Sequence, residues 1–513
     1  MWLGIIAIAV STFMLANSLY MDPDNAWFPI MGRGIAEGNI FLTNWISGTQ
    51  TFYFPYVHIE AFWALFFKNY QIAHAISVTT LVLLLGAIML LAIKGLSNQK
   101  KKANVFAALI PIVVFTTLYI AVVSLSFAHL APAMSLIVVA YLYYVARDNK
   151  WSKWGIVGLL ACWTDDLNYV YFLAPIVLEN ILYYIKNKQS DPMFKWIAVG
   201  MLVYAIRRSL FMDVGIEYIG YDTVSSGLID IVGIQNFPHK IAKIFLNFMN
   251  LFSIIPYDGF KINTQNFVPV FFFAAVASLS VYLHFTSGKK IIKEKFSDKN
   301  RFLSFFIISS VSLFALVLFF NIDPDNIKYS NTTRYLFPIF INFLIVFGHW
   351  INEKLSNKDA CILFIFTCVL SIPQQPRFYN KYSLQAIQER TKLVNTIYDE
   401  KLHSGYAASG NALNTNFMLN KNLVASVHKS NASGKIIAVT DYQLNKADFY
   451  RAKFDFVITW IDNPPYNNFE NTLLNDDIIE TFGLPKKTID IDRLRLYIYD
   501  HNISNKIKKP MLK

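Results

Sequence analysis

Two aspartates follow directly after the first apolar run of the chain, in the sequence Asp22-Pro23-Asp24. The proline stiffens the backbone between them, and alternation points the two side chains in different directions. One carboxylate can then act as a general base while the other binds an acceptor or a cation. The structural alternative is a helix N-cap, because an aspartate before Ala26 and Trp27 is a common helix start. We take Asp24, with Asp22 beside it, as the candidate catalytic residue.

A second acidic pair, Asp165 and Asp166, lies between two later apolar runs. Carboxylates close to hydrocarbon are costly to maintain and usually have a function, so we take this pair as a candidate binding site. A helix cap at a solvated turn is the structural alternative. His129, in a short turn expected on the same side, faces either this site or the membrane interface. The sequence leaves the presence of a metal open and indicates no other cofactor, since it has no Gly-rich phosphate loop or metal-spaced histidine cluster.

Three arginines at the ends of apolar runs, all expected on the same side, are candidates for binding an anion. Arg334 precedes Tyr335 at the start of an apolar run, and Arg207 and Arg208 close an earlier one. A guanidinium matches phosphate oxygens in pairs. The structural alternative is snorkelling, in which an arginine at a helix end reaches the lipid headgroups. We expect these arginines and Tyr335 to bind substrate.

Long apolar runs are the elements that must position these residues. Of the 513 residues, 55% are hydrophobic and 16% are charged, whereas soluble domains have about 25% charged residues. The runs approach the roughly 20 residues needed to cross a hydrocarbon core. The sequence therefore predicts a polytopic α-helical membrane protein with about eleven membrane-spanning helices. Their expected ranges are 2–19, 71–93, 105–122, 124–146, 154–163, 168–185, 193–206, 267–286, 302–320, 335–350 and 360–372. No Lys or Arg precedes the first run, so we expect a retained span there rather than a signal peptide.

The distribution of basic residues predicts the orientation of the chain. The net charge of +12 comes from clusters between the apolar runs and does not indicate nucleic-acid binding. With the N-terminus in the cytoplasm, the five cytoplasmic linkers contain 18 Lys and Arg residues and the opposite side contains 9 before the C-terminal tail. The positive-inside rule favours this orientation. We expect an integral protein of a bacterial inner (plasma) membrane. The five linkers are 94–104, 147–153, 186–195, 287–301 and 351–359.

A change in composition divides the chain at about residue 372. Residues 1–372 are expected to form the transmembrane domain, with long outer loops at 20–70 and 207–266. Residues 373–513 are polar and are expected to form a soluble α/β domain outside the cytoplasm. Buried runs at 435–440 and 454–461 and an alternating run at 493–499 predict strands, and 384–402 predicts a helix.

This layout resembles the GT-C superfamily of integral-membrane glycosyltransferases, which use polyprenyl-phosphate sugars. Protein O-mannosyltransferases, aminoarabinose transferases and oligosaccharyltransferases also have a first span, then at once an acidic residue, then a long outer loop. The resemblance implies a GT-C-like fold over residues 1–372 and implies that Asp22 or Asp24 is the functional acid of the first loop. It also implies that the second acidic pair binds substrate and that Arg334 and Tyr335 match an Arg-Tyr element of several GT-C families.

The sequence thus predicts a membrane glycosyltransferase. It would transfer a sugar from a polyprenyl-phosphate donor to a lipid, glycan or protein acceptor at the outer face of the membrane. Three alternatives remain open: a polysaccharide polymerase or ligase of another membrane fold, a lipid or sugar transporter of the flippase type, and a membrane scaffold without activity. A transporter would show internal repeats and broken helices at mid-membrane, and no clear repeat is present.

Overall fold

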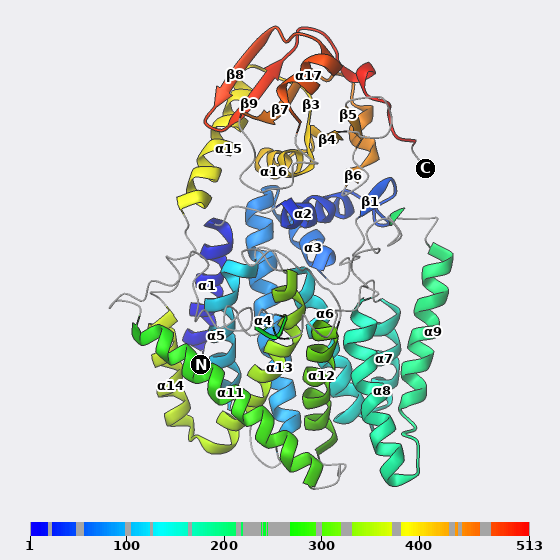
Figure 1. Cartoon of the computed structure of the whole chain (residues 1–513), viewed down its shortest axis with the longest axis vertical. Coiled ribbons are helices and arrows are strands. Elements are labelled where there is room, and N and C mark those ends of the chain that lie inside the picture. The colour runs from blue at the N-terminus through cyan, green and yellow to red at the C-terminus, as the bar shows by residue number, and fades with distance from the viewer. Residues whose placement is uncertain are drawn as a thin grey trace. The chain divides into compact units, whose positions relative to one another are not determined.

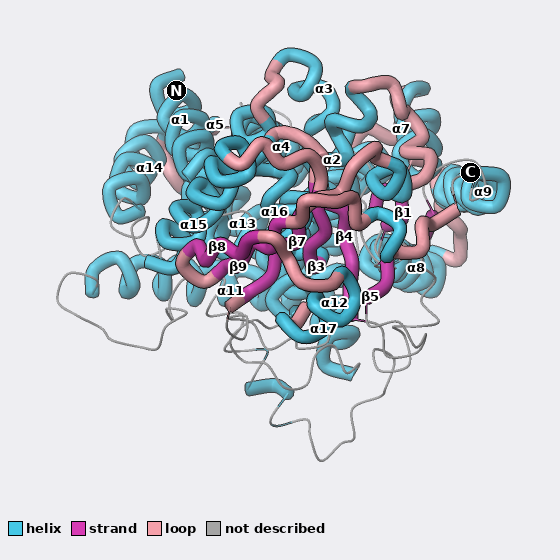
Figure 2. Tube along the Cα trace, turned by 90° about the horizontal axis from the view of Figure 1, so that it is seen from above, coloured by secondary structure: helices cyan, strands magenta, loops and turns pink. Residues whose placement is uncertain are grey.

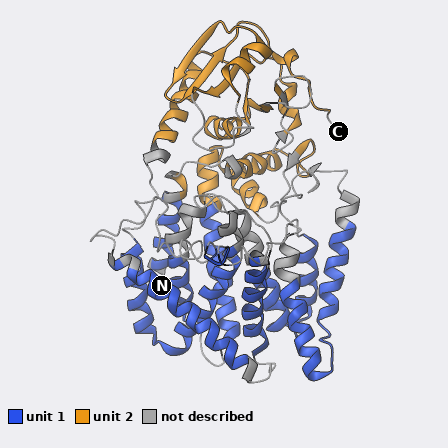
Figure 3. Cartoon of the chain, viewed as in Figure 1, with its two compact units in different colours: residues 1–15, 78–209, 221–378 blue, residues 16–77, 210–220, 379–513 orange. Residues whose placement is uncertain are grey.

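The computed structural model describes most of the chain, and the described residues belong to two compact units (Figure 3). The first unit comprises residues 1–15, 78–209 and 221–378, and the second comprises residues 16–77, 210–220 and 379–513. The described residues are 2–18, 23–47, 56–97, 104–123, 127–162, 167–211, 217–218, 238, 240–242, 244, 267–293, 300–319, 331–371, 381–429, 437–439, 444–461 and 473–511.

The first unit is built from helices (Figure 1). The N-cap of α7 follows the usual chemistry, because Asn149 precedes the helix and its side chain accepts a hydrogen bond from the backbone amide of Trp151. The helices that supply this unit, wholly or in part, are α1 (Trp2–Ser18), α4 (Tyr70–Leu96), α5 (Val105–Val123), α6 (Phe127–Tyr144), α7 (Lys150–Ala161), α8 (Leu167–Asn187), α9 (Phe194–Phe211), α11 (Phe267–Lys293), α12 (Arg301–Phe319), α13 (Asn331–Lys354) and α14 (Asn357–Ser371).

The prediction of about eleven membrane-spanning helices is wrong. Each predicted run coincides with a helix, but within the described residues only Tyr70–Leu96 and Phe271–Ile291 are long and apolar enough to cross a membrane. The other described apolar stretches are shorter than the roughly 20 residues that a crossing requires, or polar side chains such as Glu179 of α8 interrupt them. By length and composition, then, two helices are candidates for membrane association. The shorter stretches are Gly4–Met14, Val105–Val114, Met134–Tyr144, Phe194–Ile206 and Arg301–Ala315.

Small residues allow close helix contacts inside the first unit. A Cβ atom on Gly348 of α13 would lie 2.5 Å from the carbonyl oxygen of Ala107 in α5. Polar side chains are also buried between helices, where Asn342 of α13 donates to the hydroxyls of Ser309 and Ser310 in α12, at 3.2 Å each. Helices in contact through small residues and hydrogen-bonded polar groups are typical of membrane bundles.

The second unit joins parts of the chain that are far apart in sequence. Helices α2 (Pro23–Ala36) and α3 (His58–Phe66) pack against each other, and α2 also packs against α16 (Ser409–Leu419) of the C-terminal region. A small sheet makes the same connection, because β1 (Trp45–Ser47) pairs with both β2 (Glu217–Tyr218) and β6 (Leu444–Asn445). Residues expected in two outer loops and in the C-terminal tail therefore fold together.

A six-stranded mixed sheet forms the centre of the C-terminal region, in the order β5-β4-β3-β7-β9-β8 (Figure 2). Strand β3 is parallel to β4 and β7, and the remaining pairs are antiparallel. The strands are β3 (Gly405–Ala408), β4 (Val424–Lys429), β5 (Ile437–Val439), β7 (Phe456–Trp460), β8 (Lys487–Ile491) and β9 (Leu494–Ile498). The helical elements are α15 (Lys381–Asp399), α16, η6 (Lys446–Tyr450), α17 (Asn475–Phe482) and η8 (Ser504–Lys506).

Alternation along the strands buries both faces of this sheet. Tyr406 of β3 belongs to one apolar cluster, with Val457 of β7, whereas its neighbour Ala407 belongs to the other, with Phe456 and Ile458. Successive side chains of a strand point to opposite faces, so β3 and β7 each contribute to two cores. The predicted strands at 435–440, 454–461 and 493–499 and the predicted helix at 384–402 are confirmed in type, as β5, β7, β9 and α15.

Candidate functional site

The structure describes the backbone of some of the predicted site residues but none of their side chains. Asp24 is the second residue of α2, which begins at Pro23, close to the expected start. Asp22, Asp165 and Asp166 lie outside the described residues. His129 is in α6, Arg207 and Arg208 are in α9, and Arg334 and Tyr335 are in the first turns of α13. The chemical functions assigned to these residues stay predictions.

The helix that carries Asp24 is held tightly against α3. A Cβ atom on Gly32 of α2 would lie 2.6 Å from the Cβ atom of Glu60 and 2.9 Å from the backbone nitrogen of Ala61. One residue further on, Arg33 donates to the carbonyl oxygen of Ala64, at 2.7 Å, and satisfies a carbonyl near the C-terminus of α3. Glycine at this contact and arginine beside it fix the position of α2.

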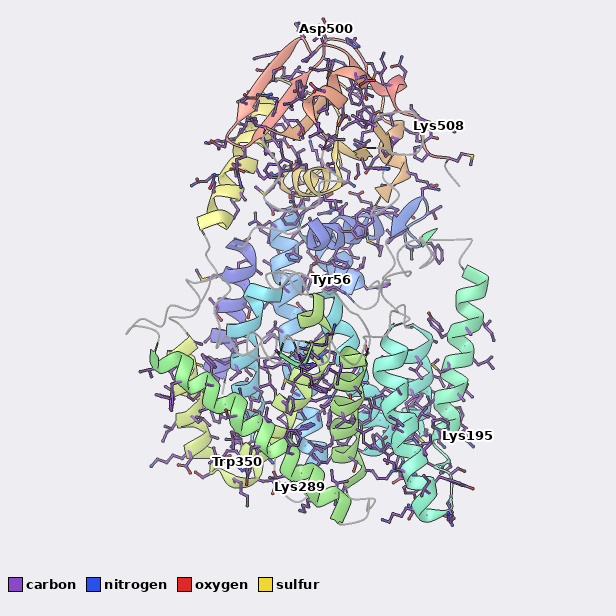
Figure 4. The ribbon with its side chains drawn as sticks, viewed as in Figure 1. Tyr56, Lys195, Lys289, Trp350, Asp500 and Lys508 are labelled. Carbon is purple, nitrogen blue, oxygen red and sulfur yellow. The ribbon has the colours of Figure 1, made fainter. Side chains whose placement is uncertain are left out.

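A buried polar cluster joins α3 to the start of α4. Nδ1 of His74 lies 2.7 Å from Oε1 of Glu60, and the Ser77 hydroxyl donates to Oε2 of Glu60 at 3.0 Å. The Tyr56 hydroxyl lies 3.4 Å from the same His74 nitrogen. All four side chains are buried: the exposed fractions of Tyr56, Glu60, His74 and Ser77 are 0%, 1%, 4% and 0%. Tyr56 is labelled in Figure 4. These four residues are called the Glu60 cluster below.

The electrostatics of the Glu60 cluster are those of a buried carboxylate with hydrogen-bond donors around it. An ionised carboxylate only accepts, so Nδ1 of His74 carries the hydrogen toward Glu60. Burial, and to a lesser degree the Glu60 carboxylate, raise the pKa of the Tyr56 hydroxyl well above its usual value. The Tyr56 hydroxyl therefore keeps its proton and stays neutral at physiological pH.

The C-terminal region covers part of the same cluster. The ring of Phe417 in α16 lies edge-on to His74, with 6.3 Å between ring centroids. The Asn420 side chain, directly after α16, accepts from the backbone amide of Tyr70 at 2.6 Å. The first-loop helices and the C-terminal region are thus bound to each other through α16 and the start of α4.

A buried carboxylate paired with an imidazole has two chemical uses. It can orient a histidine that exchanges protons with a substrate, because the hydrogen bond to Nδ1 sets the tautomer of the ring. It can also fasten helices together, since removing one partner leaves an unpaired group in the interior. Exposed fractions of 1% and 4% for Glu60 and His74 favour the second use. We assign the Glu60 cluster to positioning: it holds α3, and through Gly32 also α2, against α4.

The sequence analysis missed the Glu60 cluster. The signal was present, since Glu60 is the only acidic residue of α3, a helix that is otherwise largely apolar and aromatic. An isolated carboxylate among such residues needs a partner, and His74 and Ser77 occupy positions three apart on the next helix. Which partner Glu60 takes depends on how the two helices pack, and periodicity alone does not give that.

A second buried network lies in the first unit. Arg301, at the start of α12, binds Glu179 of α8 through two parallel contacts of 2.7 and 2.8 Å, and also binds Asp191. Arg147 contacts the other oxygen of Asp191 at 3.2 Å, and the Tyr144 hydroxyl donates to Glu179 at 2.9 Å. Both carboxylates are thus satisfied by several donors, as buried charges require.

This network brings together segments that the sequence assigned to one side of the membrane. Arg147, Asp191 and Arg301 come from three of the five linkers expected in the cytoplasm. Asn104 and Asn352 connect the other two linkers, because the Asn352 side chain accepts a hydrogen bond from the backbone amide of Asn104 at 2.7 Å. The five basic linkers are therefore connected in two groups.

The described residues contain no group of three or more His, Cys, Asp or Glu side chains that could hold a metal ion. The predicted ligands of a divalent cation are Asp22, Asp24, Asp165 and Asp166, and the structure does not describe their side chains. The three cysteines, Cys162, Cys361 and Cys368, are free thiols.

No protein-family model matches the chain, and no curated protein has significant sequence similarity to it.

Proposed function

We propose that this protein is a membrane-associated glycosyltransferase that takes a sugar from a polyprenyl-phosphate donor and transfers it to a lipid, glycan or protein acceptor. The observation that carries the proposal is which segments of the chain make up the second unit. Residues 16–77, 210–220 and 379–513 fold together, so the helix that begins at the acidic pair is part of a folded body and not of a loose loop. A transferase needs this rigidity, because a base must be held within hydrogen-bond reach of its acceptor.

The proposed reaction is a displacement at the anomeric carbon. Asp24, or Asp22, takes the proton of the acceptor hydroxyl as its oxygen attacks that carbon, and the bond from the carbon to the phosphate oxygen breaks. The lipid phosphate leaves as an anion, which Arg334 and the Arg207 and Arg208 pair would bind. The second acidic pair, His129 and Tyr335 would contact the sugar.

The proposed location is a bacterial inner membrane, with the N-terminus in the cytoplasm and residues 373–513 on the opposite side. The convergence of the basic linkers supports this orientation. Lys195 and Lys289, from two of these linkers, lie toward the same end of the first unit (Figure 4). Basic residues gathered at one end of a helical bundle are expected at a cytoplasmic surface.

The decisive experiment compares a strain that lacks the gene with the same strain carrying it on a plasmid. Mass spectrometry of surface glycans and glycolipids should show one sugar modification missing from the deletion strain. The polyprenyl-phosphate sugar donor should accumulate on the outer face of its membrane. Accumulation on the cytoplasmic face would indicate a flippase instead, and unchanged glycans and donor levels would refute a transferase.

A further inference from the structure

We infer that the C-terminal region has a binding site for an oxyanion, a phosphate or a carboxylate, between the carboxyl ends of β3 and β7. This site is separate from the reaction proposed above and does not depend on it. It is formed by Arg390 of α15, Asn411 in the first turn of α16, and the amino end of α16, beside Trp460 at the end of β7.

Arg390 is a buried cation without a carboxylate partner among the described residues. Its exposed fraction is 2%, and its two hydrogen bonds go to neutral oxygens, Oγ1 of Thr415 at 3.3 Å and Oδ1 of Asn411. The Trp460 ring, 5.6 Å from the guanidinium carbon, is its other contact. A buried charge is costly unless a countercharge accompanies it. An anion from solution would supply that countercharge.

The carboxylate of the preceding residue, Glu389, does not pair with Arg390. Glu389 is bound through both oxygens to Arg493, at 2.6 and 2.9 Å, and Arg493 lies 5.6 Å from the same Trp460 ring. Two guanidinium groups and one carboxylate thus surround one indole, which leaves a net positive charge. The Arg493 side chain is 30% exposed, so the cluster reaches the surface on that side.

Two further groups beside Arg390 offer hydrogen-bond donors. Asn411 is 3% exposed, and its Nδ2 atom has no hydrogen-bond partner within the described part of the chain. An unpaired buried amide group costs free energy, and Nδ2 can only donate. Helix α16 starts after Ala408, which provides no side-chain cap. The first amides of a helix lack partners within the helix and attract anions.

The topology of the sheet accounts for the position of these groups. Strand β3 lies between β4 and β7 (Figure 2), and it is parallel to both. After β3 the chain passes through α16 to β4 on one side, whereas after β7 it continues through α17 to β8 and β9 on the other. In sheets of this kind, ligands bind outside the carboxyl ends of the strands where the chain direction diverges. An oxyanion there would receive donors from Arg390, Asn411 and α16.

The test uses the full-length protein, purified in detergent, at constant ionic strength. Isothermal titration with inorganic phosphate, glucose 1-phosphate and glucuronate measures binding, and glucose serves as a neutral control. We expect saturable binding of at least one of the three anions and no binding of glucose. Comparing phosphate with glucuronate shows whether the site takes a phosphate or a carboxylate. Replacing Arg390 by Gln should weaken binding by about tenfold to a hundredfold, since it removes a charged hydrogen-bond donor. Arg495→Gln, which removes a partly exposed arginine of the same sheet that is paired with Asp490, is the matched control and should bind like the natural protein.

A second variant keeps the test decisive if Arg390→Gln does not fold. Asn411→Asp preserves size and places a carboxylate against Arg390, so it supplies the countercharge from within. We expect this variant to unfold at a higher temperature than the natural protein without ligand, and to lose anion binding. The inference is overturned if the natural protein binds none of the three anions, if glucose binds equally well, or if Asn411→Asp binds anions with unchanged affinity.

Discussion

Replacing Gly32 by alanine should destabilise the protein, although the same change usually stabilises a helix. The new Cβ atom would lie 2.6 Å from the Glu60 Cβ atom, whereas ordinary contacts begin at 3.4 Å, so α2 and α3 must move apart by several tenths of an ångström. The nearby atoms include the backbone of Ala61, which cannot rotate away. Overpacking of this kind costs about 1–3 kcal/mol, against a gain of about 0.5–1 kcal/mol from removing a helical glycine. The net expectation is a loss of about 1–2 kcal/mol.

Thermal and denaturant unfolding of the purified protein in detergent measure this effect. Gly158→Ala is the matched control, because Gly158 is also inside a helix, and a Cβ atom there would meet nothing within 4 Å. That variant should gain about 0.5–1 kcal/mol. The displaced α2 of Gly32→Ala should also slow glycosyl transfer, since a shift of about 1 Å can cost about a hundredfold in rate. If both alanine variants are stabilised equally, the tight contact of α2 with Glu60 does not exist.

Three further predictions concern the first unit and the proposed chemistry. Arg301→Leu should lower stability by about 3–5 kcal/mol, because it leaves two buried carboxylates without their main partner; a change below about 1 kcal/mol in denaturant unfolding, as for an exposed pair, would contradict the buried network. Arg334→Ala should abolish transfer and Arg334→Lys should impair it, with normal membrane insertion, because Lys cannot pair with two phosphate oxygens; full activity of the alanine variant would leave only a headgroup contact. Cysteines placed at Lys101 and Lys290 should be labelled from the cytoplasm and a cysteine at Ser430 from the opposite side; labelling of position 430 from the cytoplasm alone would reverse the orientation.

The positions of the helices and strands could be predicted from the sequence better than the number of times the chain crosses a membrane. The apolar runs gave the positions of the helices, but run length alone treated segments such as 154–163 as spans and ignored Glu179 inside 168–185. Strands β5, β7 and β9 were visible as apolar or alternating runs, whereas β3, with the sequence Gly-Tyr-Ala-Ala, was too short and too rich in small residues to be recognised.

The contacts that join distant residues were beyond the sequence. Arg301 and Glu179 are 122 positions apart, and only the packing of α12 against α8 brings them together. Glu60 and His74 are 14 positions apart on different helices, so no single period connects them. Arg390 was equally hidden, because its lack of a carboxylate partner is a property of the folded sheet and cannot be seen in its sequence neighbours.

Glycosyl transfer by the Asp24→Asn variant is the most direct test of the proposed function. A general base must be ionised, and asparagine cannot take the proton, yet it keeps the size of the aspartate side chain at the second position of α2. The account predicts normal expression and folding of this variant, with the rate of sugar transfer from a polyprenyl-phosphate donor lowered by at least about a hundredfold. Asp22→Asn should be the milder of the two, because Asp24 belongs to α2 and Asp22 precedes it. If both variants transfer sugar at a near-normal rate, the acidic pair is only a helix cap, and the proposed glycosyltransferase loses its base.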